Sequence, residues 1–178
     1  MLFIQTPVNG VFLVEPERIS DERGFFARTW CGEEFQAHGL NPTLAQCSLS
    51  FSRRRGTLRG LHYQAAPHGE AKLVRCTRGA IFDVAVDLRP GSPTYLAWYG
   101  AELSGDNRVM LYVPEGCAHG QLTLADDTEV FYQMSAPYVP TAARGVRFDD
   151  PALGIAWPGE VLVVNQRDRT YPDVDVAR

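Results

Sequence analysis

With 178 residues and a mass of 19.8 kDa, the chain is long enough to bury the core of one domain, and we expect residues 1–178 to form a single domain. Hydrophobic residues make up 45% and charged residues 21% of the chain, which is typical of a globular protein rather than a disordered one. The formal net charge of −4 disfavours a broad nucleic-acid-binding surface, because such surfaces are strongly basic.

The sequence gives no sign of a membrane partner or of export. No apolar run approaches the length that crosses a bilayer, and the first residues lack the basic start and apolar stretch of a signal peptide. The cysteines, at positions 31, 47, 76 and 117, form no Cys-x-x-Cys pair or zinc-finger spacing. We therefore expect free thiols and a cytoplasmic protein.

Strand signals dominate the chain. Runs rich in β-branched and aromatic residues predict strands at residues 11–15, 43–48, 73–76, 80–88, 96–102, 109–113, 121–124 and 129–135. Arg78-Gly79 resembles a hairpin turn between the third and fourth of these strands. One helix is predicted, over residues 32–38, and the segment from residue 151 onward is expected to wrap the strands. Many short strands without alternating helices indicate an all-β sandwich or barrel.

The segment 114–120 refines this fold class. Its Pro-x-Gly-x-x-His pattern, which ends at His119, resembles the second metal-binding motif of cupins. The partner motif would contain His-x-His, but the matching region reads His62-Tyr63-Gln64 with one histidine. Two histidines cannot supply the three nitrogens of such a metal site. We therefore predict a cupin-type jelly-roll β-barrel with a few short helices and no metal.

Cationic side chains accompany these motifs. Arg59 and His62 are three residues apart, Lys72 and Arg75 follow, and Arg23 lies upstream. If these cations converge on one cavity, they form a clamp suited to a diphosphate, because guanidinium groups match phosphate oxygens in a bidentate way.

The order and spacing of the motifs resemble the dTDP-4-dehydrorhamnose 3,5-epimerase family. The likeness extends over nearly the whole chain. The matching segments are residues 21–26, 56–64, 72–75, 83–89, 114–120, 145–151 and 157–158, together with Tyr132. This resemblance implies an epimerase that acts on a nucleotide-linked 4-keto-6-deoxyhexose through an enolate, and a homodimer in which the amino-terminal strands form the contact region.

The resemblance also implies roles for four catalytic residues. His62 removes a proton from the carbon beside the ketone, and Asp168 orients the imidazole and stabilises the imidazolium. Lys72 stabilises the enolate oxygen. Tyr132 returns a proton from the opposite face and so inverts the centre. This chemistry needs no cofactor and no metal.

Several further residues are expected to contact the substrate. The predicted substrate-binding residues are Arg23, Phe26, Arg28, Gln46, Ser48, Arg59, His119 and Tyr138. Structural alternatives remain open for some of these positions. His119 could simply bond inside its turn, and Tyr132 could be an aromatic residue of a core strand. Asp83 and Asp87 share one face of a strand and are expected to be mainly structural, although Asp83 could also support a residue of the site.

The sequence departs from the family pattern around the expected nucleotide base. Family members usually carry an acid where this chain has Arg28, and an asparagine where it has Ser48; Phe148 replaces a common tryptophan. Arginine reverses the charge of an acid and can only donate hydrogen bonds. We therefore expect an altered base pocket, with thymidine as the default and cytidine or another base as a credible alternative.

Three other functions compete with double epimerisation. One is a mono-epimerase or ketoisomerase that acts on a related dTDP-, CDP- or other nucleotide sugar. A second is a non-catalytic sugar-binding cupin, which the presence of all four expected catalytic residues disfavours. A third is a metal-dependent cupin dioxygenase, which the incomplete first motif disfavours.

Overall fold

The computed structural model describes residues 1–174 of the chain, and this part is almost entirely β-structure. The strands are β1 (Leu2–Gln5), β2 (Phe12–Glu15), β3 (Arg18–Asp21), β4 (Gly24–Ala27), β5 (Gln46–Ser52), β6 (Leu58–Gln64), β7 (Lys72–Arg78), β8 (Ala80–Asp87), β9 (Trp98–Ser104), β10 (Met110–Val113), β11 (Cys117–Thr123), β12 (Thr128–Met134) and β13 (Ala143–Gly145). The helices are α1 (Gly32–Ala37) and α2 (Gln166–Arg169). The predicted jelly-roll class is confirmed.

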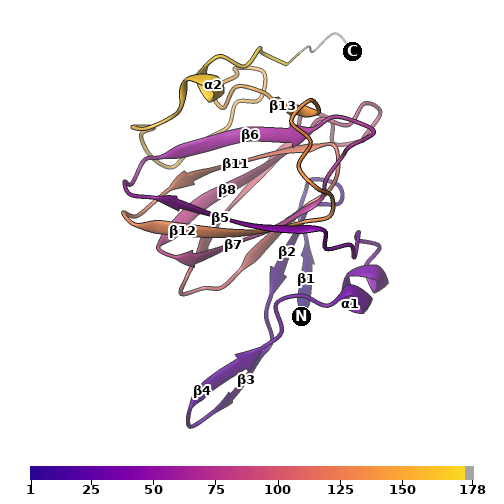
Figure 1. Ribbon diagram of the computed structural model, residues 1–178, viewed down its shortest axis with the longest axis vertical. Helices are drawn as coiled ribbons and strands as arrows, with labels where there is room; N and C mark the ends of the chain where they lie inside the picture. The colour runs from indigo at the N-terminus through magenta and orange to yellow at the C-terminus, as the bar shows by residue number, and fades with distance from the viewer. Residues whose placement is uncertain (175–178) are drawn as a thin grey trace.

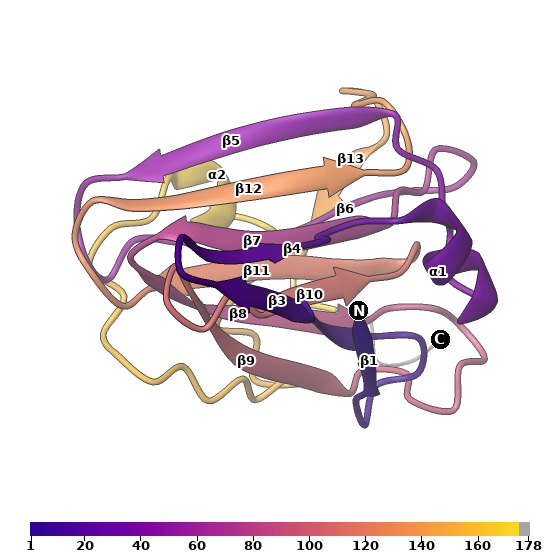
Figure 2. The ribbon, with the colours of Figure 1, turned by 90° about the horizontal axis from the view of Figure 1, so that it is seen from below.

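Two antiparallel sheets face each other (Figures 1 and 2). One sheet has six strands in the order β1-β2-β10-β7-β12-β5, and the other has five in the order β13-β6-β11-β8-β9. Strands β3 and β4 form a separate two-stranded arm that projects away from the barrel (Figure 1). None of the helices in the described part of the chain is long and apolar enough to cross a membrane.

The core between the sheets comes from alternate side chains of both. Val74 and Cys76 of β7 meet Ile81 and Ala85 of β8 in one cluster, and all four are buried. Because successive strand residues point to opposite faces, a run of alternating apolar residues fills such an interior from one side. At one end of the barrel the inward positions become polar, and this end carries the cavity.

The predicted hairpin at Arg78-Gly79 is wrong. A turn does lie there, with Gly79 at a φ of 76°, but β7 and β8 belong to different sheets. β7 pairs with β10 and β12, whereas β8 pairs with β11 and β9. The turn therefore carries the chain across the barrel. Turn residues reveal that the chain reverses but not which strand becomes the hydrogen-bonded neighbour.

Other differences from the predicted elements have local causes. The strand expected at residues 43–48 is β5, Gln46–Ser52, whose polar side chains face inward and whose Leu49 and Phe51 face solvent. β6 was not predicted as a strand, because Gly60 interrupts its pattern. The short elements β1, β3, β4, β13 and α2 were not predicted either. The helix expected at 32–38 is confirmed as α1.

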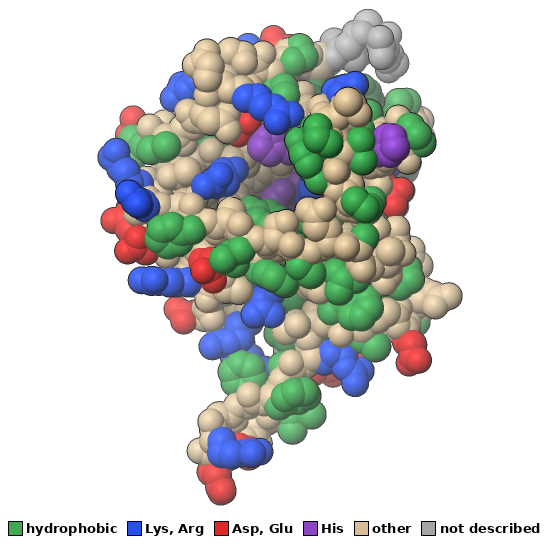
Figure 3. All heavy atoms as spheres, in the orientation of Figure 1, with side chains coloured by type: hydrophobic (Ala, Val, Ile, Leu, Met, Phe, Trp, Pro, Cys, Tyr) green, Lys and Arg blue, Asp and Glu red, His purple; other side chains and the backbone are tan. Residues whose placement is uncertain are grey.

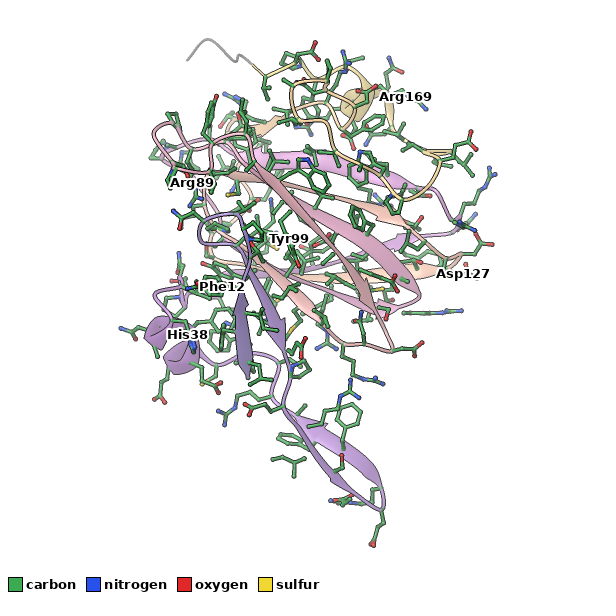
Figure 4. The ribbon with its side chains drawn as sticks, turned by 180° about the vertical axis from the view of Figure 1, so that it is seen from behind. Phe12, His38, Arg89, Tyr99, Asp127 and Arg169 are labelled. Atoms are coloured by element: carbon green, nitrogen blue, oxygen red, sulfur yellow. The ribbon has the colours of Figure 1, made fainter. Side chains whose placement is uncertain are left out.

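Two segments cover the outer faces of the sheets. Helix α1 places Phe35 against Val14, Leu73 and Met110 on the outer face of the six-stranded sheet. Seen from behind, Phe12 and His38 lie at this same flank (Figure 4). The segment after residue 150 runs over the five-stranded sheet as predicted, with Leu153 packed in the cluster of Leu61 and Val84. Arg169 marks α2 above that sheet (Figure 4).

Candidate active site

A cavity of about 380 Å³ opens at one end of the barrel between the two sheets. Figure 3 shows this hollow, with histidine side chains inside it and Lys or Arg side chains around its mouth. The residues that line it are Ser48, Leu49, Ser50, Arg59, His62, Tyr63, Gln64, Glu70, Lys72, His119, Tyr132, Tyr138, Ala143, Arg144, Asn165, Arg167 and Asp168. The cavity therefore gathers all four expected catalytic residues.

His62 and Asp168 form a hydrogen-bonded pair. His62 lies on β6, and its Nε2 is 2.8 Å from Asp168 Oδ1. Asp168 is fully buried, whereas 41% of the His62 side chain is exposed to the cavity. Asn165 caps α2 by accepting the backbone N–H of Asp168, which holds the carboxylate in place. The imidazole therefore has a fixed anionic partner on one nitrogen and an accessible side for a ligand.

The charge on Asp168 is stabilised despite burial. Burial alone raises the pKa of this carboxyl, but hydrogen bonds from His62 and from the Gly60 backbone N–H, at 3.0 Å, outweigh it and the net pKa is lowered. An ionised Asp168 fixes a proton on the Nε2 of His62. The other ring nitrogen is then the one that can accept a proton from a ligand.

A second imidazole–carboxylate pair lies deeper in the barrel. His119 of β11 is opposite His62 in the antiparallel register, and its Nε2 is 2.8 Å from Asp83 Oδ1. Both side chains are buried. Burial raises the pKa of Asp83, and its proximity to His119 and Lys72 opposes that shift. His119 therefore lines the cavity, and its hydrogen bond goes to Asp83 on the neighbouring strand β8 and not to a group inside its own turn.

Tyr132 enters the cavity from the opposite sheet. It lies on β12, its hydroxyl is 3.1 Å from Ser50 Oγ, and its ring centroid is 6.1 Å from that of His119. Burial raises the pKa of Tyr132 to about 12. The phenol is thus a stable proton donor that faces the cavity from the side across from His62.

Lys72 lies at the cavity wall with a nearly buried ammonium group. Its Nζ donates to the His62 backbone carbonyl at 3.2 Å and is 3.1 Å from Glu70 Oε1. Gln64 beside it accepts the Val139 backbone N–H and so ties the next loop to the wall. The site therefore contains one fixed cation close to the proposed base.

The mouth of the cavity is cationic. Arg59, Arg144 and Arg167 all line it, and Arg59 is held by the Phe51 carbonyl at 3.0 Å. Tyr138 stands exposed at the rim. Three guanidinium groups at one opening suit an anionic ligand with several oxygens, such as a diphosphate.

Four predicted substrate-binding residues do not line the cavity, and three of them lie on or directly after the β3–β4 arm. Arg23 and Phe26 lie on the β3–β4 arm, where Arg23 pairs with Asp21 and Phe26 is 73% exposed. Arg28 follows this arm and pairs with Glu34 at 2.7 Å. The arm projects away from the barrel (Figure 1), so within one protomer these residues are separated from His62.

Gln46 occupies an intermediate place. It lies on β5 beside the rim, where its Oε1 accepts the Tyr138 backbone N–H at 3.1 Å and its Nε2 contacts Ser48. Ser48 itself lines the cavity. Gln46 therefore does not line the cavity itself, but it contacts Ser48 and Tyr138, which do.

Sequence reasoning missed several residues of the site. Arg144 lies on the short strand β13, which carried no strand signal, and Arg167 is adjacent to Asp168 in the same motif. Ser50 could have been found from the alternation of β5, in which Ser48 and Ser50 share a face. Nothing in the sequence separates Glu70 from an ordinary loop acid.

The arrangement supports general acid–base chemistry. A base with a carboxylate partner and a buried phenol face one cavity from opposite sheets, and an ammonium group lies near the base. In the part of the chain that the structure describes, no group of three or more His, Cys, Asp or Glu comes together as a metal site.

Comparisons with known proteins agree with this description. Residues 5–175 match the family model described as dTDP-4-dehydrorhamnose 3,5-epimerase. A relative of that name from Sinorhizobium fredii is 44% identical and covers 98% of this chain and 90% of its own length. A dTDP-4-dehydrorhamnose 3-epimerase from Streptomyces niveus is 41% identical, with coverages of 91% and 78%. The crystal structure of the 3,5-epimerase from Elizabethkingia anophelis matches with a TM-score of 0.94 at 36% identity, over 97% of this chain and 96% of that one.

Proposed function

Because the chain belongs to the dTDP-4-dehydrorhamnose 3,5-epimerase family, we propose that it inverts the two carbons beside the keto group of a nucleotide-linked 4-keto-6-deoxyhexose. One observation carries the proposal: His62 with its Asp168 partner and Tyr132 face the same cavity from opposite sheets. Inversion of a carbon needs a base on one face and an acid on the other, and this geometry supplies both.

His62 is the base in this proposal. The hydrogen on a carbon beside a ketone becomes acidic when the resulting enolate is stabilised. Asp168, ionised and 2.8 Å from Nε2, favours the imidazolium that forms when His62 accepts the proton. The accessible face of the ring leaves room for the sugar.

Lys72 and Tyr132 complete the reaction. In the proposed reaction the Lys72 ammonium group stabilises the oxygen on which negative charge develops, and the low solvent exposure of this group strengthens the interaction. Tyr132 then gives its proton to the carbon from the other face. A phenol with a pKa of about 12 is fully protonated at neutral pH and is therefore ready to donate.

The outcome at each carbon is measured by isotope incorporation. The protein is incubated with dTDP-4-keto-6-deoxyglucose in deuterated water, and the label is located by NMR. Label at both carbons beside the ketone is expected. Label at one carbon identifies a mono-epimerase, for which the similarity to the Streptomyces niveus 3-epimerase is the specific support. Absence of label at both carbons contradicts the proposed function.

We further propose that the protein is a homodimer in which the β3–β4 arm of each protomer completes the partner's cavity. The arm leaves the barrel and exposes Ile19, Phe25 and Phe26, and an exposed apolar patch of this kind is typical of an interface. Arg23 and Phe26, which are far from His62 in their own protomer, then reach a substrate in the other one.

Mixed dimers test this arrangement. A His62→Ala protomer and an Arg23→Ala/Phe26→Ala protomer, each weak alone, are unfolded and refolded together. If the arm acts in the partner, each mixed dimer contains one intact cavity and activity returns. Activity that stays at the level of the separate variants contradicts the arrangement. Light scattering of the unmixed protein reports the oligomeric state directly.

The cellular location is proposed as the cytoplasm. Two of the four cysteines, Cys76 and Cys117, are buried, and all four are free thiols. Reduced cysteines are typical of a reducing compartment.

A further inference from the structure

A buried carboxylate lies in the cavity wall next to the lysine of the proposed reaction. Glu70 lines the cavity, its side chain is 9% exposed, and its Oε1 is 3.1 Å from Lys72 Nζ. Charged side chains are almost never buried unless they are paired. Glu70 takes no part in the proton transfers between His62, Tyr132 and the sugar, so its burial beside the lysine needs another explanation.

Both oxygens of the Glu70 carboxylate are engaged. Oε1 contacts the Lys72 ammonium group, and Oε2 accepts a hydrogen bond from Gln64 Nε2 at 3.2 Å. Gln64 is itself fixed, because its Oε1 accepts the Val139 backbone N–H at 2.6 Å and its Nε2 donates to the Pro137 carbonyl at 3.2 Å. The loop that follows β12 therefore holds the carboxylate in one orientation through Gln64.

Glu70 and the backbone of β6 together fix the position of the Lys72 ammonium group. Nζ donates to the His62 carbonyl at 3.2 Å, on the strand that carries the proposed base, and it contacts Glu70 at 3.1 Å. An ammonium group has three N–H donors, so two fixed oxygens still leave one donor for an oxygen of the substrate. The lysine is thus held beside the base with a donor to spare.

A lysine without a fixed partner would have a competing one in this cavity. Lysine carries a compact charge on a flexible four-carbon stem. A nucleotide sugar brings a diphosphate past the guanidinium groups at the cavity mouth, which belong to Arg59, Arg144 and Arg167. The ammonium group of a free lysine would be drawn toward that diphosphate and away from the keto oxygen. A carboxylate 3.1 Å from Nζ opposes this movement.

Asp83 is a second carboxylate near Lys72, but it is held differently. Lys72 opposes the rise in pKa that burial causes at Asp83, so the two charges interact. Asp83 Oδ1, however, is 2.8 Å from His119 Nε2, and this carboxylate is therefore paired with an imidazole. Direct contact with the lysine comes from Glu70.

We propose that Glu70 is a positioning residue that holds the Lys72 ammonium group beside the proposed base, where it stabilises the enolate oxygen. The inference rests on the proposed epimerase function, and it assigns Glu70 no direct contact with the reacting atoms. Loss of the carboxylate therefore lowers kcat, because enolate formation slows. KM stays constant or falls, because removal of an anion from the cavity does not weaken the binding of a diphosphate.

Glu70→Gln tests the proposal, because an amide keeps the shape of the side chain and an acceptor oxygen but removes the charge. The matched control is Glu115→Gln. Glu115 is exposed, contacts Asn41 and lies against Gly69, next to Glu70 in the chain, but it does not line the cavity. Deuterium exchange at the sugar carbons, measured at several substrate concentrations, gives kcat and KM for each variant.

We expect Glu70→Gln to lower kcat by about tenfold or more, because a misplaced catalytic group is costly, and to raise KM by no more than about twofold. Glu115→Gln should match the wild type in both constants. A smaller loss of kcat, or a rise in KM that accounts for the loss of activity, overturns the inference.

A double-mutant cycle tests whether Glu70 acts through Lys72. In the Lys72→Met background we expect Glu70→Gln to change kcat by less than about twofold, because the group that Glu70 positions is absent. Equal losses in the two backgrounds overturn the inference. If Glu70→Gln does not fold, Glu70→Asp replaces it in the cycle. This variant withdraws the carboxylate by one methylene group, so an unchanged kcat in the presence of Lys72 overturns the inference as well.

Calorimetric titration with dTDP, or with CDP if the wild type prefers it, gives a second test that does not depend on turnover. We expect Glu70→Gln to bind the nucleotide at least as tightly as the wild type, because the cavity has lost a negative charge. Binding that is weaker by more than about threefold overturns the inference. Failure of the wild-type protein to incorporate any label instead contradicts the proposed epimerase function, so the two failures are distinguishable.

Discussion

Asp168 orients His62 through one carboxylate oxygen and bonds the backbone of the same strand through the other. Oδ1 is 2.8 Å from His62 Nε2, and Oδ2 accepts the Gly60 backbone N–H at 3.0 Å. The partner of Oδ2 lies on β6, two residues before the histidine. The same strand therefore presents the imidazole and fixes the carboxylate that orients it, and Asp168 joins the carboxyl-terminal segment to the barrel.

Loss of either member of this pair should reduce proton exchange. We expect His62→Ala to remove exchange at the substrate carbons, a loss of about 10²–10⁴-fold, which is the usual contribution of a general base. Asp168→Asn should also reduce exchange strongly, because a neutral amide neither fixes the tautomer nor stabilises the imidazolium. Deuterium incorporation measures both variants. Asp149→Asn, at an exposed carboxylate paired with Arg147, is the control, and undiminished exchange in His62→Ala would refute the role of His62.

Replacement of Tyr132 should separate exchange from inversion. In Tyr132→Phe the base still removes the proton and can return a deuteron to the same face, but the proton donor on the opposite face is lost. We expect label to enter while the yield of inverted sugar falls by about 10²-fold or more. NMR of the product measures both quantities in one sample. Full inversion by this variant would show that another group supplies the proton.

The pH profile should also reflect the environment of Tyr132. Burial raises its pKa to about 12, so the phenol remains protonated well above the ordinary tyrosine pKa of 10.0. We expect no loss of inversion from this group as pH rises from 7 to about 10.5. The protonation state of the phenol is followed by measuring the yield of inverted sugar per exchanged proton across this pH range. A decline in this ratio centred near pH 10 would indicate an unperturbed phenol.

The sequence identified the core of the site because its residues lie in short contiguous motifs. His62 follows Arg59-Gly60-Leu61 on one strand, and Asp168 lies in the motif that starts at Asn165. Their mutual contact spans 106 positions in the chain, and no spacing rule predicts such a contact. It was inferred from resemblance and is confirmed as a hydrogen bond.

Other features could not be predicted because they depend on the packing of distant strands. The Arg78-Gly79 turn looks local, yet its two strands join different sheets. Gln121 has the pattern of an ordinary strand residue, and only the register places it opposite Asp83, with both side chains buried. Likewise, the separation of Arg23 and Phe26 from the cavity follows from the direction of the arm, which hydrophobic pattern does not encode.

Asp87 should stabilise the fold in a pH-dependent way. Although burial acts to raise its pKa, hydrogen bonds from Arg89, Ser92 and Thr94 outweigh burial and lower it from 3.8 to about 2. This difference corresponds to about 2 kcal/mol of unfolding free energy at pH 7. Because the pKa is lower in the folded state, the contribution is fully present above about pH 5 and is lost as pH falls through 3.8 toward 2.

Urea unfolding of the wild type and Asp87→Asn at several pH values measures this contribution. We expect the difference in unfolding free energy to be about 2 kcal/mol at pH 7. The part of this difference that comes from the lowered pKa of Asp87 should fall to about half at pH 3. Asp149→Asn, with its exposed carboxylate, serves as the control and should change stability little. A difference between wild type and Asp87→Asn that stays constant with pH would show that packing, and not charge, sets the effect.

The choice of nucleotide should depend on Arg28, the residue that replaces a usual acid of the family. Its guanidinium donates to Glu34 at 2.7 Å and offers further donors but no acceptor. Thymine presents an N3–H that needs an acceptor, whereas cytosine presents an acceptor at N3. If the arm reaches the base in the partner's cavity, Arg28 disfavours thymine relative to cytosine. We therefore expect dTDP and CDP to bind within about tenfold of each other, a difference of about 1.4 kcal/mol or less.

Calorimetric titration with dTDP, CDP, UDP and GDP measures this preference. Arg28→Gln supplies an amide oxygen as an acceptor, so we expect it to shift the dTDP-to-CDP affinity ratio toward dTDP. Arg18→Gln is the matched control, because Arg18 lies on the same arm and contacts the Phe25 ring at 5.1 Å instead. That variant should leave the ratio unchanged. A wild-type preference for dTDP above about hundredfold, or an affinity ratio that Arg28→Gln does not change, would show that Arg28 does not contact the base. The remaining residues of the cavity rim, Ser48 among them, would then determine nucleotide choice.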